Sequence, residues 1–265
     1  MTKDTKKSSM MPVLIIALVL IATVAGIAYL YSTSKPPTPG NTSTTASNTS
    51  RTPSVPANAP PGASPVYAIG QPTAAVTIEE FADFQCPSCA VAHPVMKDIQ
   101  SAYAGNKNVR FVFRHLPLGI HDKAYDAATV VEAAGMQGVP KFWAMMDQMM
   151  SGQQTWANSG NYREIWRGYA EKIGLDVPKW ESDAAGLGTK GRIDLDIQRA
   201  RALGVSSTPS VYINNKLIPF ADVNVPTMKQ LIDSEIEAAT KASAPANSAA
   251  GTNAAAANQT ANTSK

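Results

Sequence analysis

Residues Ala75 to Ala90 read Ala-Val-Thr-Ile-Glu-Glu-Phe-Ala-Asp-Phe-Gln-Cys-Pro-Ser-Cys-Ala. The first half of this stretch, up to Phe81, alternates β-branched and other side chains over the length of a strand. A helical pattern begins just beyond the first cysteine, Cys86. We therefore expect the dithiol of Cys86 and Cys89 to lie where a strand passes into a helix.

This position makes Cys86 the expected nucleophile. A helix start presents unpaired backbone N–H groups and the positive end of the peptide dipoles, so it favours a thiolate and lowers the pKa of a thiol. The two intervening residues, Pro87 and Ser88, place Cys89 about one helical turn away. From there Cys89 can close a disulfide with Cys86 and attack a mixed disulfide formed at it. We expect Cys86 to be exposed and Cys89 to be buried.

A structural disulfide and a zinc site are the alternatives for this pair. Zinc usually takes four ligands, but the chain has only 2 cysteines, and its 3 histidines show no ligand spacing to them. A bridge across so short a loop would remove little entropy from the unfolded chain. Reversible thiol chemistry is therefore the favoured interpretation.

From Phe81 to Cys89 the sequence resembles the active-site stretch of the DsbA-like branch of the thioredoxin superfamily. Pro94 falls where that superfamily has a kink in its first helix. Val205 to Asn214, Val-Ser-Ser-Thr-Pro-Ser-Val-Tyr-Ile-Asn, resembles the loop and strand that carry its cis-proline. The resemblance covers roughly residues 66–241 and implies a thioredoxin-like fold.

The same resemblance implies that the peptide bond between Thr208 and Pro209 is cis, which is a minority state for such bonds in general. It would place the backbone of Thr208 beside Cys86, where it can pair with an extended substrate segment as another strand would.

Glu80, six residues before Cys86, falls where the superfamily keeps a buried acid under the active site. A buried carboxyl there can accept the proton of Cys89, which must ionise before it attacks. Asp83 is the second candidate for this role. Glu79 is expected to be an exposed strand residue.

The remaining chain predicts one α/β domain with a helical insertion at about residues 121–204. The active-site helix is expected to end near Tyr103. The patterns then predict a strand at 108–114, helices at 121–138, 141–151, 162–173 and 189–203, strands at 210–214 and 216–218, and a helix at 227–239.

Two other groups of side chains invite a functional interpretation. Four methionines follow Phe142 at helical spacing and could bind copper(I) through their thioethers, but core packing is the commoner use. They are Met145, Met146, Met149 and Met150. His115 and His121 are expected to be structural or solvated.

The N-terminal region has the pattern of a membrane anchor. Residues 11–31 contain no charged side chain. A helix of this length is roughly 32 Å long and can cross the hydrocarbon core of a bilayer. A cleaved signal peptide is the alternative, but its apolar core usually has only about 7 to 15 residues, so we expect an uncleaved anchor. Residues 1–10 carry three lysines close to the span, so we expect them in the cytoplasm.

The segments on either side of the domain differ from it in composition. Residues 32–65 are rich in Pro, Ser and Thr and residues 242–265 in Ala, Asn, Ser and Thr, and we expect both to be disordered. Residues 66–241 carry 17 Lys and Arg against 19 Asp and Glu. This balance does not suggest a nucleic-acid partner.

Together these features predict a membrane-anchored thiol:disulfide oxidoreductase on the periplasmic or extracellular side, where disulfides persist. We expect it to donate the Cys86–Cys89 disulfide to cysteine-containing proteins, with no cofactor beyond this pair. The resemblance further implies a quinone-linked membrane protein as the electron partner.

Two other functions remain open. Thr208 resembles the isomerase branch, and Ser88 departs from the histidine that DsbA has between its cysteines, so a disulfide isomerase or reductase is the alternative within the same class. From another class, a tethered copper-binding or chaperone module would use the dithiol and the methionines.

Overall fold

The computed structural model describes residues 58–243. The expected cytoplasmic N-terminus and membrane anchor, and most of the expected linker and tail, lie outside these residues; the first two residues of the expected tail belong to the last helix. Within them no helix combines the length and the apolar character that a membrane crossing requires.

Residues 58–243 contain one sheet of five strands in the order β1-β3-β2-β4-β5. Strands β2 and β3 are parallel, and the other neighbouring pairs are antiparallel. The strands are β1 (Ala68–Ile69), β2 (Val76–Ala82), β3 (Val109–His115), β4 (Ser210–Ile213) and β5 (Lys216–Ile218).

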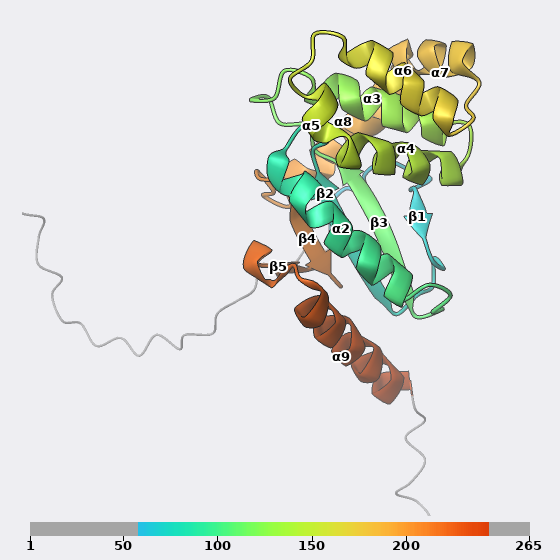
Figure 1. Ribbon diagram of the computed structural model, residues 1–265. Helices are drawn as coiled ribbons and strands as arrows, with labels where there is room; N and C mark the ends of the chain where they lie inside the picture. The colour runs from blue at the N-terminus through green and yellow to red at the C-terminus, as the bar shows by residue number, and fades with distance from the viewer. Residues whose placement is uncertain (1–57, 244–265) are drawn as a thin grey trace, which may run out of the picture. The chain divides into compact units, whose positions relative to one another are not determined.

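Side chains alternate between the two faces of β2, and each face has its own core. Val76 and Ile78 pack with residues of α2 (Pro87–Ala102) and α9 (Val225–Ser243). Phe81 points to the opposite face, where it packs with Ala200 of α8 (Leu187–Ala202). In Figure 1, α2 crosses in front of the sheet. Because β2 is covered on both sides, all but one of its side chains are buried.

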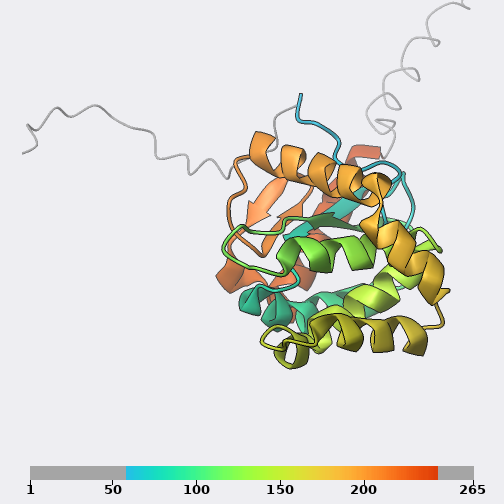
Figure 2. The ribbon, with the colours of Figure 1, turned by 90° about the horizontal axis from the view of Figure 1, so that it is seen from above.

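The helical insertion lies between β3 and β4 in the sequence and across one end of the sheet, as Figure 2 shows from above. Before α8 it comprises α3 (Ala124–Gly135), α4 (Val139–Ser151), α5 (Gln153–Trp156), α6 (Tyr162–Lys172) and α7 (Val177–Ala185). Its core joins Phe84, Cys86 and Cys89 to side chains of these helices. The dithiol therefore lies where the sheet domain meets the insertion.

Every predicted strand and helix is present, with ends that differ by a few residues. β1, α5 and α7 were not predicted from the sequence. The first two have only 2 and 4 residues, too few for a periodic pattern. Helix α7 does carry a start signal, because the Asp176 side chain accepts a hydrogen bond from the Lys179 N–H at 3.1 Å and Pro178 follows in the first turn.

The folded region also begins earlier than the expected boundary at residue 66. Ala63 is only 5% exposed, and its N–H donates to Asp196 Oδ1 at 2.8 Å. The carbonyls of Pro60 and Pro61 accept from Arg199 and Arg114. The last residues of the expected linker therefore pack on the domain.

Candidate active site

Cys86 is the N-cap of α2, with extended backbone angles (φ −71°, ψ 121°), and the helix begins at Pro87. Its N–H donates to the carbonyl of Asp83 at 3.1 Å. Its own carbonyl accepts from the N–H of Cys89 at 3.1 Å. The strand-to-helix position expected for the dithiol is thus present.

The two sulfurs are electrostatically unequal. The hydrogen bond from Cys89 lowers the pKa of Cys86 to about 5, with help from the N–H groups of Ser88 and Cys89, although burial opposes the shift. The pKa of Cys89 is raised, first by its hydrogen bond to Cys86 and then by burial. At neutral pH this arrangement holds a Cys86 thiolate and a Cys89 thiol.

The expected exposure of Cys86 is wrong. Cys86 is 7% exposed and Cys89 is 0% exposed, so both are buried and only the first keeps any contact with solvent. The Thr208 carbonyl oxygen lies 3.4 Å from Cys86 Sγ. This loop and the core of the insertion together cover most of the cysteine.

The Thr208–Pro209 bond is cis, as predicted. The backbone of Thr208 lies beside Cys86, also as predicted. The Thr208 hydroxyl is buried and has no hydrogen-bond partner among the described residues. β4 begins directly after this loop, at Ser210, so the loop is held by a strand of the sheet.

Glu80 lies on the face of β2 that α2 covers and is only 5% exposed. Burial raises its pKa to about 7. Among the described residues no side chain forms a salt bridge with it. Its charge contributes to the raised pKa of Cys89, so the two groups are electrostatically coupled. Glu80 is thus a buried acid near Cys89, as the resemblance implied.

Glu79 is not the exposed residue that the sequence suggested. It is 6% exposed, and its carboxylate accepts from Arg114 Nε at 2.7 Å and from Arg199 Nη2 at 2.7 Å. Burial alone would raise its pKa, but the hydrogen bond from Arg199 and the charges of both arginines hold it below its usual range. Its task is structural, on the face away from the dithiol.

Asp83, the second candidate for the proton acceptor, is engaged elsewhere. Its carboxylate accepts from the N–H groups of Gln85 and Leu118, and it lies 2.6 Å from His121 Nδ1. The Asp83 side chain therefore fixes the loop after β3. His115 is buried and pairs with Glu132 at 2.9 Å. These contacts agree with structural roles for both histidines.

The four methionines and Phe142 line the buried side of α4, each with an exposure of 2% or less. They pack in the same core as Cys86 and Cys89. This is the packing that the commoner interpretation predicted.

Gln153 is a contact of the site that the sequence analysis missed. It is 2% exposed on α5, and its Nε2 donates to the carbonyls of Phe84 at 2.7 Å and Cys86 at 2.9 Å. The insertion thereby holds the backbone of the nucleophile. A lone glutamine in a one-turn helix offers no sequence signal for this contact.

A five-stranded sheet with a Cys-x-x-Cys pair at a helix start and a cis-proline beside it defines a thioredoxin-like redox fold. Residues 63–234 match the family Thioredoxin_4, described as Thioredoxin, and the chain belongs to this family.

Solved structures show the same fold. Oxidised BdbD from Bacillus subtilis is 22% identical, with a TM-score of 0.57 over 65% of this chain and 93% of that chain. The α-DsbA1 of Wolbachia pipientis is 19% identical, with a TM-score of 0.57 over 68% and 95%. A thioredoxin-like oxidoreductase from Silicibacter pomeroyi is 26% identical, with a TM-score of 0.52 over 66% and 91%.

The curated relatives are Na(+)/H(+) antiporters that are much longer than the matched region. Over 148 residues the chain is 36% identical to the Na(+)/H(+) antiporter NhaA 3 of Salinispora tropica. This match covers 56% of this chain and 21% of that protein. NhaA 1 of Salinispora arenicola gives 36% over 149 residues, with 56% and 21% covered. The match thus spans about a fifth of these relatives.

Proposed function

We propose that this protein is an extracytoplasmic thiol:disulfide oxidoreductase that donates its Cys86–Cys89 disulfide to protein thiols. The observation that carries the proposal is the inequality of the two cysteines. Cys86 keeps slight exposure and has a pKa of about 5, whereas Cys89 is fully buried and has a raised pKa. A pair of this kind suits one exchanging sulfur and one resolving sulfur.

The reaction starts from the oxidised pair. A substrate thiolate attacks Cys86 Sγ, the bond between the two cysteine sulfurs breaks, and Cys89 leaves as a thiolate that takes a proton. Glu80, with a pKa of about 7, is the nearby acid that can supply it. A second substrate thiolate then attacks the substrate sulfur of the mixed disulfide. Cys86 leaves as a thiolate, the substrate is oxidised by two electrons, and the protein pair is reduced.

The low pKa of Cys86 supports the donor direction. A thiol with a low pKa is a good leaving group, so it favours the last step, in which the substrate disulfide forms. Stabilising the Cys86 thiolate also stabilises the reduced form and makes the disulfide more oxidising. Isomerase or reductase activity remains the alternative, because Thr208 and Ser88 differ from DsbA.

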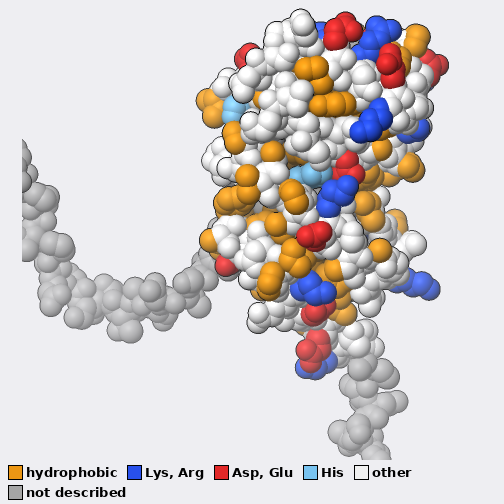
Figure 3. All heavy atoms as spheres, viewed as in Figure 1, with side chains coloured by type: hydrophobic (Ala, Val, Ile, Leu, Met, Phe, Trp, Pro, Cys, Tyr) orange, Lys and Arg blue, Asp and Glu red, His pale blue; other side chains and the backbone are white. Residues whose placement is uncertain are grey.

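The surface near the dithiol suits an extended segment of a protein substrate. Val91 on α2 is 71% exposed, and Ile120, beside His121 of the loop that Asp83 fixes, is 84% exposed. Apolar side chains also gather over α2 on the face drawn in Figure 3. Exposed apolar surface of this kind is typical of interaction sites. The backbone of Thr208 beside Cys86 would pair with the segment as a strand does.

The proposed location rests on the N-terminal sequence, and the proposed electron partner rests on the family resemblance. The uncharged residues 11–31 and the lysines before them support a single-pass anchor that places the domain outside the cytoplasm. There the reduced pair would pass its electrons to a quinone-linked membrane protein.

Oxidation of a peptide with two cysteines by the full-length oxidised chain tests the function. Wild type should form the peptide disulfide with one equivalent of reduced protein, and Cys86→Ser should form none. Given the disulfide form of the peptide instead, Cys89→Ser should accumulate a mixed disulfide at Cys86, because the Cys86 thiolate opens the peptide disulfide and no Cys89 thiol is left to resolve the product. Titration against glutathione tests the direction: a potential near that of thioredoxin would support the reductase alternative instead. Failure of wild type to oxidise or reduce the peptide would contradict the proposal altogether.

A further inference from the structure

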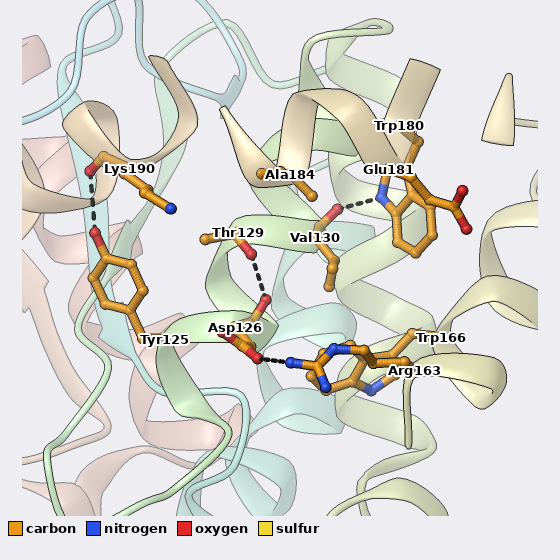
Figure 4. Close-up of a pocket in the computed structure, with 11 residues that line it drawn as sticks. Tyr125, Asp126, Thr129, Val130, Arg163, Trp166, Trp180, Glu181, Ala184 and Lys190 are labelled. Carbon is orange, nitrogen blue, oxygen red and sulfur yellow. Dashed lines mark hydrogen bonds and ion pairs between the residues drawn. The ribbon is translucent and has the colours of Figure 1, made fainter. Parts of the chain in front are cut away.

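The helical insertion contains a cleft that none of the active-site residues lines. It lies between α3, α6, α7 and α8 and has a volume of about 310 Å³ (Figure 4). This is roughly twice the volume of a cavity that holds benzene, about 150 Å³, and falls at the small end of the range of ligand sites, about 300 to 1,000 Å³.

One part of the cleft is apolar and fixed in position. Val130 of α3 and Ala184 of α7 line it together with the rings of Trp166 and Trp180. Trp180 Nε1 donates to the Val130 carbonyl at 2.7 Å, which ties α7 to α3. Both tryptophans are almost fully buried, at 1% and 3% exposure. An apolar group in the cleft would therefore contact a preformed wall.

The two carboxylates of the cleft are already neutralised. Asp126 pairs with Arg163 at 2.6 Å, and the guanidinium of Arg163 also lies over the ring of Tyr162 at 4.7 Å. Glu181 pairs with Arg167 at 3.1 Å. Both acids and the arginine of the cleft thus have partners.

Lys190 is different, because its ammonium has no salt bridge or hydrogen bond with any residue in the described part of the chain. It lines the cleft from α8, and in Figure 4 its side chain extends toward Thr129. The Thr129 hydroxyl is engaged, since it donates to the Asp126 carbonyl at 2.7 Å. The cleft therefore has one positive charge without a partner, next to an apolar wall.

We propose that this cleft binds a small amphipathic carboxylate, with the carboxylate on Lys190 and the apolar body against Val130 and Ala184. An ammonium and a carboxylate form a charge-assisted hydrogen bond, which is stronger than a neutral one. The paired acids do not repel the ligand strongly, because their arginines compensate them. The size of the cleft selects for a compact chain or ring.

Octanoate is a suitable probe, because it has one carboxylate and a short apolar chain that does not absorb near 280 nm. The full-length chain has 4 tryptophans, so labelling with ¹⁵N-tryptophan gives a small set of indole signals. Trp166 and Trp180 line the cleft. Trp143 does not, and it serves as the internal reference. Octanoate at millimolar concentrations should shift the signals of the first two and leave the third unchanged.

The charge at Lys190 is tested by Lys190→Gln, a substitution between two good helix formers. We expect it to weaken octanoate binding roughly tenfold, the loss typical of a hydrogen bond to a charged group. Lys190→Arg should retain binding. Lys107→Gln is the matched control, because Lys107 is exposed in the turn after α2 and has no salt bridge with a described residue. Equal melting temperatures of the variants would show that the fold is intact.

Octanamide, which has the same chain without the charge, should bind about as weakly to wild type as octanoate binds to Lys190→Gln. The proposal fails if octanoate leaves the signals of Trp166 and Trp180 unchanged. It also fails if octanamide binds wild type as tightly as octanoate does, or if Lys107→Gln and Lys190→Gln lower the affinity equally.

Discussion

Glu79 and Glu80 are neighbours on β2 and are almost equally buried, at 6% and 5% exposure, yet they lie on opposite faces of the sheet. Glu79 lies between two arginines, and its pKa is held below the usual range. Glu80 has no salt bridge with any described residue, and burial raises its pKa to about 7. Two almost equally buried carboxyl groups thus have pKa values shifted in opposite directions, and their ion-pair partners decide the direction.

The difference separates the two faces by task. On one face, the network of Glu79, Arg114, Arg199 and Asp196 fixes the segment before β1 to the sheet through the backbone of residues 60–63. On the other face, an acid that can gain or lose a proton near neutral pH lies under the dithiol. The ion pairs on the face of Glu79 stabilise the fold. On the face of Glu80, an acid without an ion pair is buried at a cost in stability, and it can titrate near neutral pH.

The largest effect should come from Glu79→Gln. The substitution removes the carboxylate that the buried Arg114 and the part-buried Arg199 share, so that Arg114 keeps only Asp196 and Arg199 keeps no ion pair with a described residue. Breaking a buried ion pair in this way typically costs about 3–5 kcal/mol. Urea unfolding of the full-length chain at pH 7 measures the loss. Glu80→Gln is the matched control on the other face and should lower the free energy of unfolding far less, because it breaks no ion pair. Equal stability of the two variants would contradict the division between the faces.

The second effect is a pH dependence that only Glu80 should cause. Its pKa rises from 4.5 to about 7 on folding, so the folded state binds more protons in this window. The contribution of protonated Glu80 to the free energy of unfolding is therefore fully present below pH 4.5 and is lost as the pH rises through 7. The loss should amount to about 3 kcal/mol. We expect this loss when the free energy of unfolding of wild type is measured against pH, and we expect Glu80→Gln to lack it. Parallel curves for the two proteins would exclude the raised pKa of Glu80.

The sequence predicted much of the dithiol face. Local patterns locate β2, the start of α2 and the strand after Pro209, and the two-residue spacing defines the pair. These features were accessible because each depends on residues close together in the chain. Glu80 was identified through the resemblance, which implies a buried acid six residues before the first cysteine.

The opposite face could not be predicted in this way. Glu79 was expected to be exposed because alternation suits a strand with one solvated face, whereas β2 is covered on both. Its partners, Arg114 and Arg199, lie 35 and 120 positions away. Gln153 lies 67 positions from Cys86, whose carbonyl it binds. Contacts over such separations depend on the packing of the insertion, which no local pattern encodes.

The third effect concerns the reaction. If Glu80 exchanges a proton with Cys89, Glu80→Gln should slow peptide oxidation by about 100-fold, which is a typical effect of losing a general acid or base. Stopped-flow measurement of the first exchange step at pH 7 gives the rate. Alkylation of Cys86 in the reduced protein is the control and should keep its rate, because the pKa of Cys86 does not depend chiefly on Glu80. A Glu80→Gln variant that exchanges as fast as wild type would assign the proton transfer to another group.

The smallest effect is the difference in stability between the two redox forms, and it tests the donor direction. Folding lowers the pKa of Cys86 from 9.0 to about 5. At a pH above about 5 the thiolate therefore stabilises the folded reduced chain. Because burial opposes the lowering of the Cys86 pKa and Ser88 carries no charge, we expect only about 1–2 kcal/mol at pH 7. The disulfide closes too short a loop to offset all of this by constraining the unfolded chain. The reduced form should therefore melt about 2–4 °C higher than the oxidised form.

The pH dependence of this difference identifies its cause. A lowered pKa contributes stability that is complete above pH 9 and is lost as the pH falls through about 5. The gap between the reduced and oxidised melting temperatures should therefore narrow between pH 7 and pH 5. Calorimetry of both forms of the full-length chain across this range measures it. Glu79→Gln should lower both melting temperatures and leave the gap unchanged, since it acts on the face away from the dithiol. A higher melting temperature for the oxidised form at pH 7 would instead favour a reductase.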